Sequence, residues 1–111
     1  MRLTHELRRD LVTPIAAGED IFGARVVCDL VNGIDILRVD ATTVGGTGAI
    51  EAINIAAAAR RTVFPHVFCP IHVHLACAFP NIESVERFQK NPERILCIGY
   101  SAMFPPREKG K

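Results

Sequence analysis

The sequence predicts an α/β fold, in which about four consecutive β/α units share one parallel sheet. Two observations support this fold class. Apolar runs alternate with helix-like segments along the chain, which is the pattern of successive β/α units. At 111 residues, of which 49% are hydrophobic, the chain can bury roughly two thirds of the surface that its unfolded form exposes. We therefore expect one globular unit.

The first unit begins with residues 12–17 (VTPIAA), which are predicted to form a strand that ends before Glu19. Residues 23–31 are predicted to form the helix that follows. Gly33 comes directly after this segment, and glycine at that place is typical of a helix C-terminus.

The second unit begins with residues 34–39 (IDILRV), a predicted strand that ends at Asp40. The glycines at 45 and 46 predict a turn, and Thr47 is suited to cap a helix that runs to about residue 61. Alanines in this helix favour close packing on a sheet, and the polar Glu51 and Asn54 are expected on its outer face.

Two further units complete the predicted sheet. Residues 62–64 are predicted to form a strand that ends near His66, and residues 70–79 a short helix with proline at its first position. Residues 82–85, which end at Glu86, are the candidate for a last strand. One ionisable residue therefore follows each predicted strand, and in a (β/α) barrel the catalytic groups converge at these carboxyl ends.

Composition excludes several classes of partner. Thirteen Lys and Arg residues against twelve Asp and Glu residues leave a formal net charge of +1, so the chain lacks the basic surface that binds nucleic acid or an anionic membrane. No signal peptide core and no run of ~20 apolar residues is present. We expect a cytoplasmic protein that binds neither nucleic acid nor membrane.

The cysteines are expected to be reduced and to serve as small buried hydrophobic side chains. Their spacing contains no C-x-x-C motif, and the sequence carries no export signal. The four residues are Cys28, Cys69, Cys77 and Cys97.

Four motifs between residues 11 and 86 resemble one family in their order. They are TPIAAGED with Glu19, DATTVGG with Asp40, PHVF with His66, and HLACAFPNIESVE ending at Glu86. Together they resemble the mandelate racemase and muconate lactonizing enzyme family of the enolase superfamily. The resemblance implies the C-terminal half of a (β/α)₈ TIM barrel. Residues 1–86 would form this partial barrel, with a divergent tail over 87–111.

The resemblance also implies a role for each of these residues. Glu19 matches a carboxylate ligand of a catalytic Mg²⁺, an ion that prefers oxygen ligands. His66 and Asp40 match a dyad in which the imidazole is the general base and the carboxylate orients it. Glu86 matches an acid that donates a hydrogen bond to the substrate carboxylate as it becomes an enediolate. Asp40 stands where the muconate lactonizing branch has lysine, which favours racemases and acid-sugar dehydratases.

The implied function is the Mg²⁺-dependent abstraction of the proton beside the carboxylate of a small hydroxy acid or sugar acid. The enzyme would be a racemase, an epimerase or a dehydratase. Because a complete barrel takes roughly 250 residues, we expect this chain to be a truncated form with little or no activity alone. An alternative is a non-catalytic barrel remnant that forms a homo-oligomer through the strand edges at 12–17 and 82–85.

A group of five histidines and cysteines between residues 66 and 77 leaves a small zinc-binding protein as a further alternative. Zn²⁺ binds histidine nitrogen and cysteine sulfur in a tetrahedral arrangement. The spacing fits no standard zinc finger, and on a helix His72 and His74 would point about 200° apart. The group comprises His66, Cys69, His72, His74 and Cys77.

Overall fold

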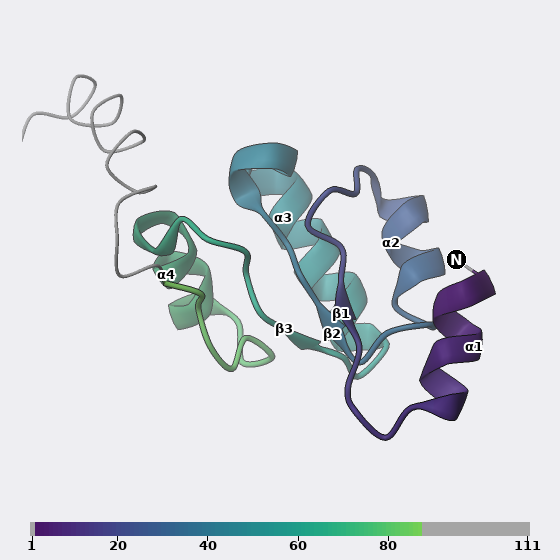
Figure 1. The fold of residues 1–111 in the computed structure, drawn as a ribbon. Coiled ribbons are helices and arrows are strands. Elements are labelled where there is room, and N and C mark those ends of the chain that lie inside the picture. Colours follow the sequence, from purple (N-terminus) through teal and green to yellow (C-terminus); the bar gives the residue numbers. More distant parts are fainter. Residues whose placement is uncertain (1, 88–111) are drawn as a thin grey trace, which may run out of the picture.

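The computed structural model describes residues 2–87, in which helices and strands alternate as the sequence predicts (Figure 1). The elements are α1 (Arg2–Asp10), β1 (Ala16–Ala17), α2 (Ala24–Leu30), β2 (Ile36–Leu37), α3 (Ala41–Ala58), β3 (Thr62–Val63) and α4 (Cys69–Ala78). The predicted α/β class is confirmed. Most of the predicted tail, residues 88–111, lies outside the described part.

The strands form one parallel sheet in the order β1-β2-β3. Ala17 lies opposite Leu37, and Leu37 lies opposite Val63. Ile82 adds a single parallel bridge to Val63 on the far side of β3. Successive units therefore lie side by side in sequence order, which is the arrangement expected of a barrel segment.

The strands are shorter than predicted, because proline and side-chain acceptors interrupt the ladder. The prediction of a strand over 12–17 is wrong for its first residues: Pro14 has no N–H, and the Ile15 N–H donates to the Asp35 carboxylate (3.0 Å) instead of to a strand. The predicted strand over 82–85 is reduced to the bridge at Ile82. Pro65 explains this, since it has no N–H to extend the ladder.

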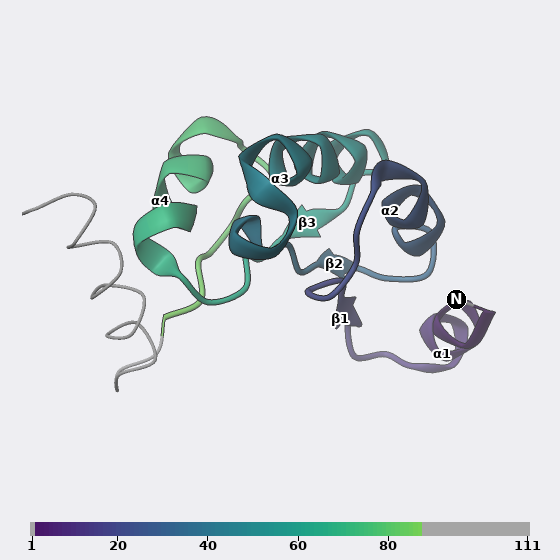
Figure 2. The ribbon, with the colours of Figure 1, turned by 90° about the horizontal axis from the view of Figure 1, so that it is seen from above.

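Helices α2, α3 and α4 lie along one face of the sheet (Figure 2). Ile34, Leu37 and Val63 from the sheet side are fully buried against Ile53 of α3, and burial of each such side chain contributes about 1.5–3 kcal/mol. Small side chains at the contact bring α3 close to the sheet, as predicted; they are Ala49, Ala52 and Ala56. Glu51 and Asn54 are exposed on the outer face, which confirms the orientation expected for this helix.

The start of α3 differs from the prediction of a helix capped by Thr47. The helix begins at Ala41 with Asp40 as its N-cap, because the Asp40 carboxylate accepts a hydrogen bond from the Thr42 N–H (2.8 Å). Gly45 (φ 73°, ψ 166°) then kinks the chain, so two helical segments are joined there. The predicted break at the glycines is therefore present, but a first turn of helix, beginning at Ala41, precedes it.

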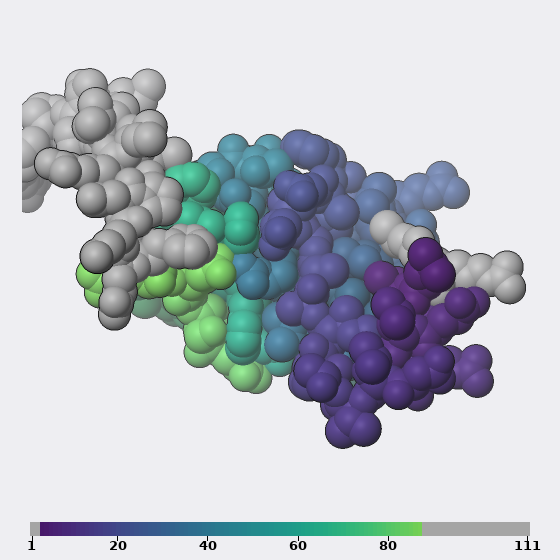
Figure 3. Space-filling view, in the orientation of Figure 1, coloured from purple at the N-terminus to yellow at the C-terminus, as the bar shows by residue number. Residues whose placement is uncertain are grey.

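Helix α1 was not predicted from the sequence. Its Arg8 donates a hydrogen bond to Asp35 (2.8 Å), at the start of β2, and it lies close to Gly33, where a Cβ would come within 2.7 Å of the Thr4 hydroxyl. In the space-filling view, the purple N-terminal segment forms one end of the described part, and the yellow-green residues after α4 form the other (Figure 3).

The described cysteines are free thiols, but they are not the buried hydrophobic residues that the sequence led us to expect. Cys28 and Cys77 are exposed and Cys69 is partly buried, while Cys97 lies outside the described part of the chain. Among residues 2–87, none of the helices combines the length and the apolar character that a membrane crossing requires.

Asp35→Asn is expected to lower the free energy of unfolding by about 1 kcal/mol at neutral pH, because a neutral amide accepts weaker hydrogen bonds from Ile15 and Arg8. These two donors lower the pKa of Asp35 from 3.8. The ionised carboxylate therefore stabilises the folded chain above pH 3.8, and this contribution is lost as the pH falls through the lower pKa of the folded state. Urea unfolding at neutral and acidic pH measures the difference.

The matched control is Asp29→Asn, at an exposed position on α2. Equal losses in the two variants, or a loss at Asp35 that persists in strong acid, would contradict the role given to the Asp35 carboxylate.

Candidate functional site

The structure brings together all four of the ionisable residues that follow the predicted strands. Glu19 follows β1, Asp40 follows β2, His66 follows β3, and Glu86 follows the bridge at Ile82. His66 lies at the centre of the group: its Nδ1 is 3.8 Å from Asp40 Oδ2, and its Nε2 is 3.9 Å from Glu19 Oε2 and 3.8 Å from Glu86 Oε2. The group therefore forms one cluster at the carboxyl edge of the sheet.

Glu19 is placed by the glycine before it. Gly18 has φ +121°, a conformation that residues with a side chain rarely adopt, and a Cβ there would come within 2.8 Å of Leu37 Cδ1. The chain can therefore turn sharply above β2 at this point. The Glu19 side chain, 45% exposed, emerges from this turn toward the cluster.

The Asp40 carboxylate is buried, and both of its oxygens accept hydrogen bonds from the first turn of α3. One carboxylate oxygen accepts hydrogen bonds from the Thr42 N–H (2.8 Å) and hydroxyl (2.7 Å), and the other accepts from the Thr43 hydroxyl (3.3 Å). The side chain is 7% exposed. These contacts fix the oxygen that faces His66, so Asp40 can orient the imidazole without moving.

His66 is fixed through its backbone and leaves one ring nitrogen on the open side. Its N–H donates to the Val39 carbonyl (2.8 Å), which continues the hydrogen bonding between β2 and β3. The Nδ1 atom faces Asp40, whereas Nε2 faces the two glutamates, and the side chain is 31% exposed. An imidazole with one nitrogen oriented by a carboxylate and the other open has the arrangement of a general base.

Glu86 acts as a hydrogen-bond acceptor in this structure. Its Oε2 accepts from Arg38 Nη2 (2.6 Å) and from the Val67 N–H (3.0 Å). Val67 and Phe68 have left-handed backbone angles (φ 52° and 36°), which are uncommon for residues with bulky side chains. This bend turns the Val67 N–H toward the carboxylate, so the residues after His66 help to hold Glu86.

Sequence reasoning missed Arg38, which contacts two of the predicted site residues. Its Nη2 pairs with Glu86 at 2.6 Å, and its Nε lies 4.0 Å from Glu19 Oε2. The alternation along β2 contained the signal. Leu37 and Val39 are buried, so Arg38 must share the opposite face with Asp40.

The zinc alternative is contradicted by the position of His72. His72 is fully buried, its Nε2 accepts from the Ala41 N–H (3.0 Å), and its Nδ1–H donates to the Val67 carbonyl (2.7 Å). Both ring nitrogens are therefore used, Nε2 to join α4 to the start of α3 and Nδ1 to join it to the loop after β3. His74 is exposed, so these two histidines do not face a common point.

The residues present do not fit a complete Mg²⁺ site. Within residues 2–87, no group of three or more His, Cys, Asp or Glu residues lies close enough together to hold a metal ion. Mg²⁺ requires near-octahedral oxygen ligands, yet Asp40 is engaged by the first turn of α3 and Glu86 by Arg38 and Val67. Glu19 is left as a single candidate ligand.

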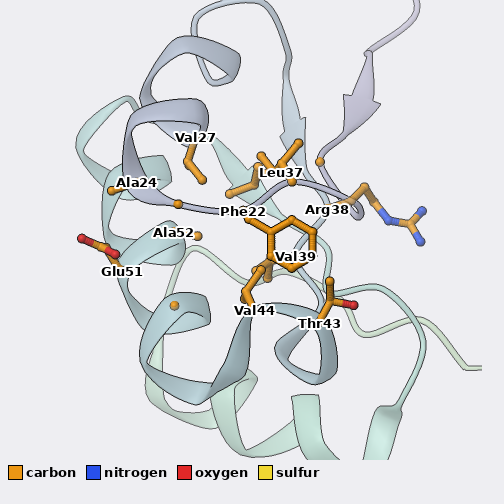
Figure 4. Close-up of a pocket in the computed structure, with 14 residues that line it drawn as sticks. Phe22, Ala24, Val27, Leu37, Arg38, Val39, Thr43, Val44, Glu51 and Ala52 are labelled. Carbon is orange, nitrogen blue, oxygen red and sulfur yellow. The ribbon is translucent and has the colours of Figure 1, made fainter.

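A small apolar pocket of about 220 Å³ lies beside the cluster, between the loop after β1 and the start of α3 (Figure 4). Phe22, Val39 and Val44 line it, and the Arg38 guanidinium points away from it. The four clustered residues, Glu19, Asp40, His66 and Glu86, are not among the residues that line it. Arg38 belongs to the pocket lining and also contacts the cluster, so the two features meet at this residue.

Comparison with known proteins gives a consistent result. A family model described as enolase C-terminal domain-like matches residues 2–105. The L-talarate/galactarate dehydratase of Salmonella typhimurium (strain LT2) is 33% identical over 87 residues, which cover 76% of this chain and 22% of that protein. The chain therefore spans less than a quarter of this relative's length.

Solved structures of this family resemble the chain in fold as well as in sequence. A mandelate racemase/muconate lactonizing enzyme from Polaromonas sp. JS666 superposes with a TM-score of 0.70 at 36% identity, over 78% of this chain and 24% of that chain. The L-talarate dehydratase from Polaromonas sp. JS666, complexed with Mg and L-glucarate, gives a TM-score of 0.68 at 34% identity, over 77% and 23%. The parallel strands and helices of this chain thus match part of a barrel domain.

His72→Phe is expected to lower the free energy of unfolding by about 2 kcal/mol or more, because it leaves the Ala41 N–H and the Val67 carbonyl buried without partners. Urea unfolding measures the loss. His74→Phe is the matched control, since it makes the same change at an exposed position of α4. Similar losses in both variants, or a gain in wild-type stability on addition of zinc, would contradict this structural role.

Proposed function

This chain belongs to the enolase C-terminal domain-like family, and we propose that it carries the proton-transfer part of a site that acts beside a substrate carboxylate. The observation that carries this proposal is the position of His66, between a buried oriented aspartate and an open side lined by two glutamates. The substrate class is a small hydroxy acid or sugar acid. Relatives named L-talarate/galactarate dehydratase support the sugar-acid choice.

In this function His66 is the general base and Asp40 is its positioning residue. With Nδ1–H directed at Asp40, the lone pair on Nε2 is available to remove a proton from the open side. The imidazolium that forms would have three carboxylates within 3.9 Å of its ring nitrogens.

The chemistry needs a second element, because removal of a proton beside a carboxylate produces a dianion that positive charge or hydrogen-bond donors must stabilise. In the Polaromonas relative Mg is present together with L-glucarate. Here Glu19 is the single candidate ligand, and Glu86 is held by Arg38 and the Val67 N–H. We therefore expect little or no turnover by this chain alone.

The prediction is tested by exchange of the proton beside a carboxylate of galactarate with deuterated solvent, followed by NMR with Mg²⁺ present. Slow exchange by the wild-type chain should fall by at least about 10²-fold in His66→Asn, because the general base is lost. His74→Asn, an exposed histidine on α4, should exchange as the wild type does. Exchange that survives in His66→Asn would remove His66 as the base, and no exchange in any variant would favour a non-catalytic barrel remnant.

A homo-oligomer is the expected partner arrangement. Within the described residues, β1 pairs with β2 alone and lies at one edge of the sheet, and the Ile82 bridge lies at the other. Exposed strand edges carry free N–H and carbonyl groups that favour pairing with a second copy. Light scattering at micromolar concentration should give twice the chain mass. A stable monomer under these conditions would exclude the dimer.

A further inference from the structure

Arg38 contacts Glu19 and Glu86, the two carboxylates that a metal-binding cluster would need as free ligands. Its side chain is 21% exposed, Nη2 donates to Glu86 at 2.6 Å, and Nε lies 4.0 Å from Glu19. The Nε atom is buried and has no hydrogen-bond partner. A small movement of the Glu19 carboxylate would supply that partner, so the guanidinium can engage both glutamates at once.

A guanidinium in this position competes directly with a divalent cation. It is charged at every accessible pH, and it takes up the carboxylate oxygens that inner-sphere ligation would use. It also repels a dication over the few ångströms that separate it from both glutamates. The Val67 N–H, which donates to Glu86 at 3.0 Å, also competes for that carboxylate.

We propose that Arg38 is the resident cation of this cluster: it holds Glu19 and Glu86 as ion-pair partners and keeps them from binding a divalent metal. Long-range attraction of cations to the three carboxylates remains, but the oxygens needed for direct coordination are taken. This role of Arg38 does not depend on the proton transfer proposed above.

The test is a titration of the purified 111-residue chain with Mn²⁺, followed by electron paramagnetic resonance of the free ion. Arg38→Gln should bind Mn²⁺ at least about ten-fold more tightly than the wild type, because the competing charge is gone. Arg38→Lys keeps the charge and should bind as weakly as the wild type. Arg25→Gln is the matched control, since it removes the same charge from an exposed position on α2.

A second substitution assigns the ligand. Adding Glu19→Gln to Arg38→Gln should abolish the gained affinity if the released glutamates bind the ion. Equal affinities of Arg38→Gln and the wild type would overturn the proposal. So would an equal gain in Arg25→Gln, which would indicate net charge, or a gain in Arg38→Lys, which would indicate that the charge of Arg38 is not the cause.

The wild-type chain alone also tests the proposal, in case Arg38→Gln does not fold. NMR signals of the His66 ring, which lies within 3.9 Å of both glutamates, should stay sharp when equimolar Mn²⁺ is added. Selective broadening of these signals at low Mn²⁺ concentration would show that the glutamates already bind metal and would overturn the role of Arg38.

Discussion

The pairing of β2 with a strand on each side is the constraint on which the rest of the structure depends. With Leu37 held between Ala17 and Val63, the alternation of the strand buries Leu37 and Val39 and turns Arg38 and Asp40 to the opposite face. A slip of one residue would exchange these faces, placing Arg38 and Asp40 against the apolar helices and turning the core side chains away from them. The register that closes the core is thus the register that builds the charged cluster.

The order of the elements could be predicted from the sequence, whereas their ends could not. Helix α2 has a local stop signal in Gly33, and it was predicted within one residue at each end. The start of β1 depends instead on Asp35, twenty residues away, which accepts the Ile15 N–H. Helix α1 has the same dependence, because its Arg8 bonds to Asp35, 27 residues away. Tertiary partners of this kind leave no local pattern.

The site was predictable to the extent that it follows from strand topology. Parallel strands end at one edge, so the residues that follow them must converge, and His66 is found within 3.9 Å of three carboxylates. Arg38 was missed because it lies inside an apolar run, between Leu37 and Val39, that was interpreted only as a buried strand. The structural role of His72 could not be assigned from the sequence, since its bond to the Ala41 N–H joins residues 31 positions apart.

The charge balance of the cluster sets a requirement for the proton transfer proposed for His66. Three carboxylates face one guanidinium and one imidazole, so the cluster carries an excess of negative charge. A dianion formed on the substrate by the proposed proton transfer would be repelled by this excess. Arg38 cannot offset this while it is paired with Glu86. The described residues therefore do not by themselves stabilise the enediolate, and positive charge from another source would be needed for turnover.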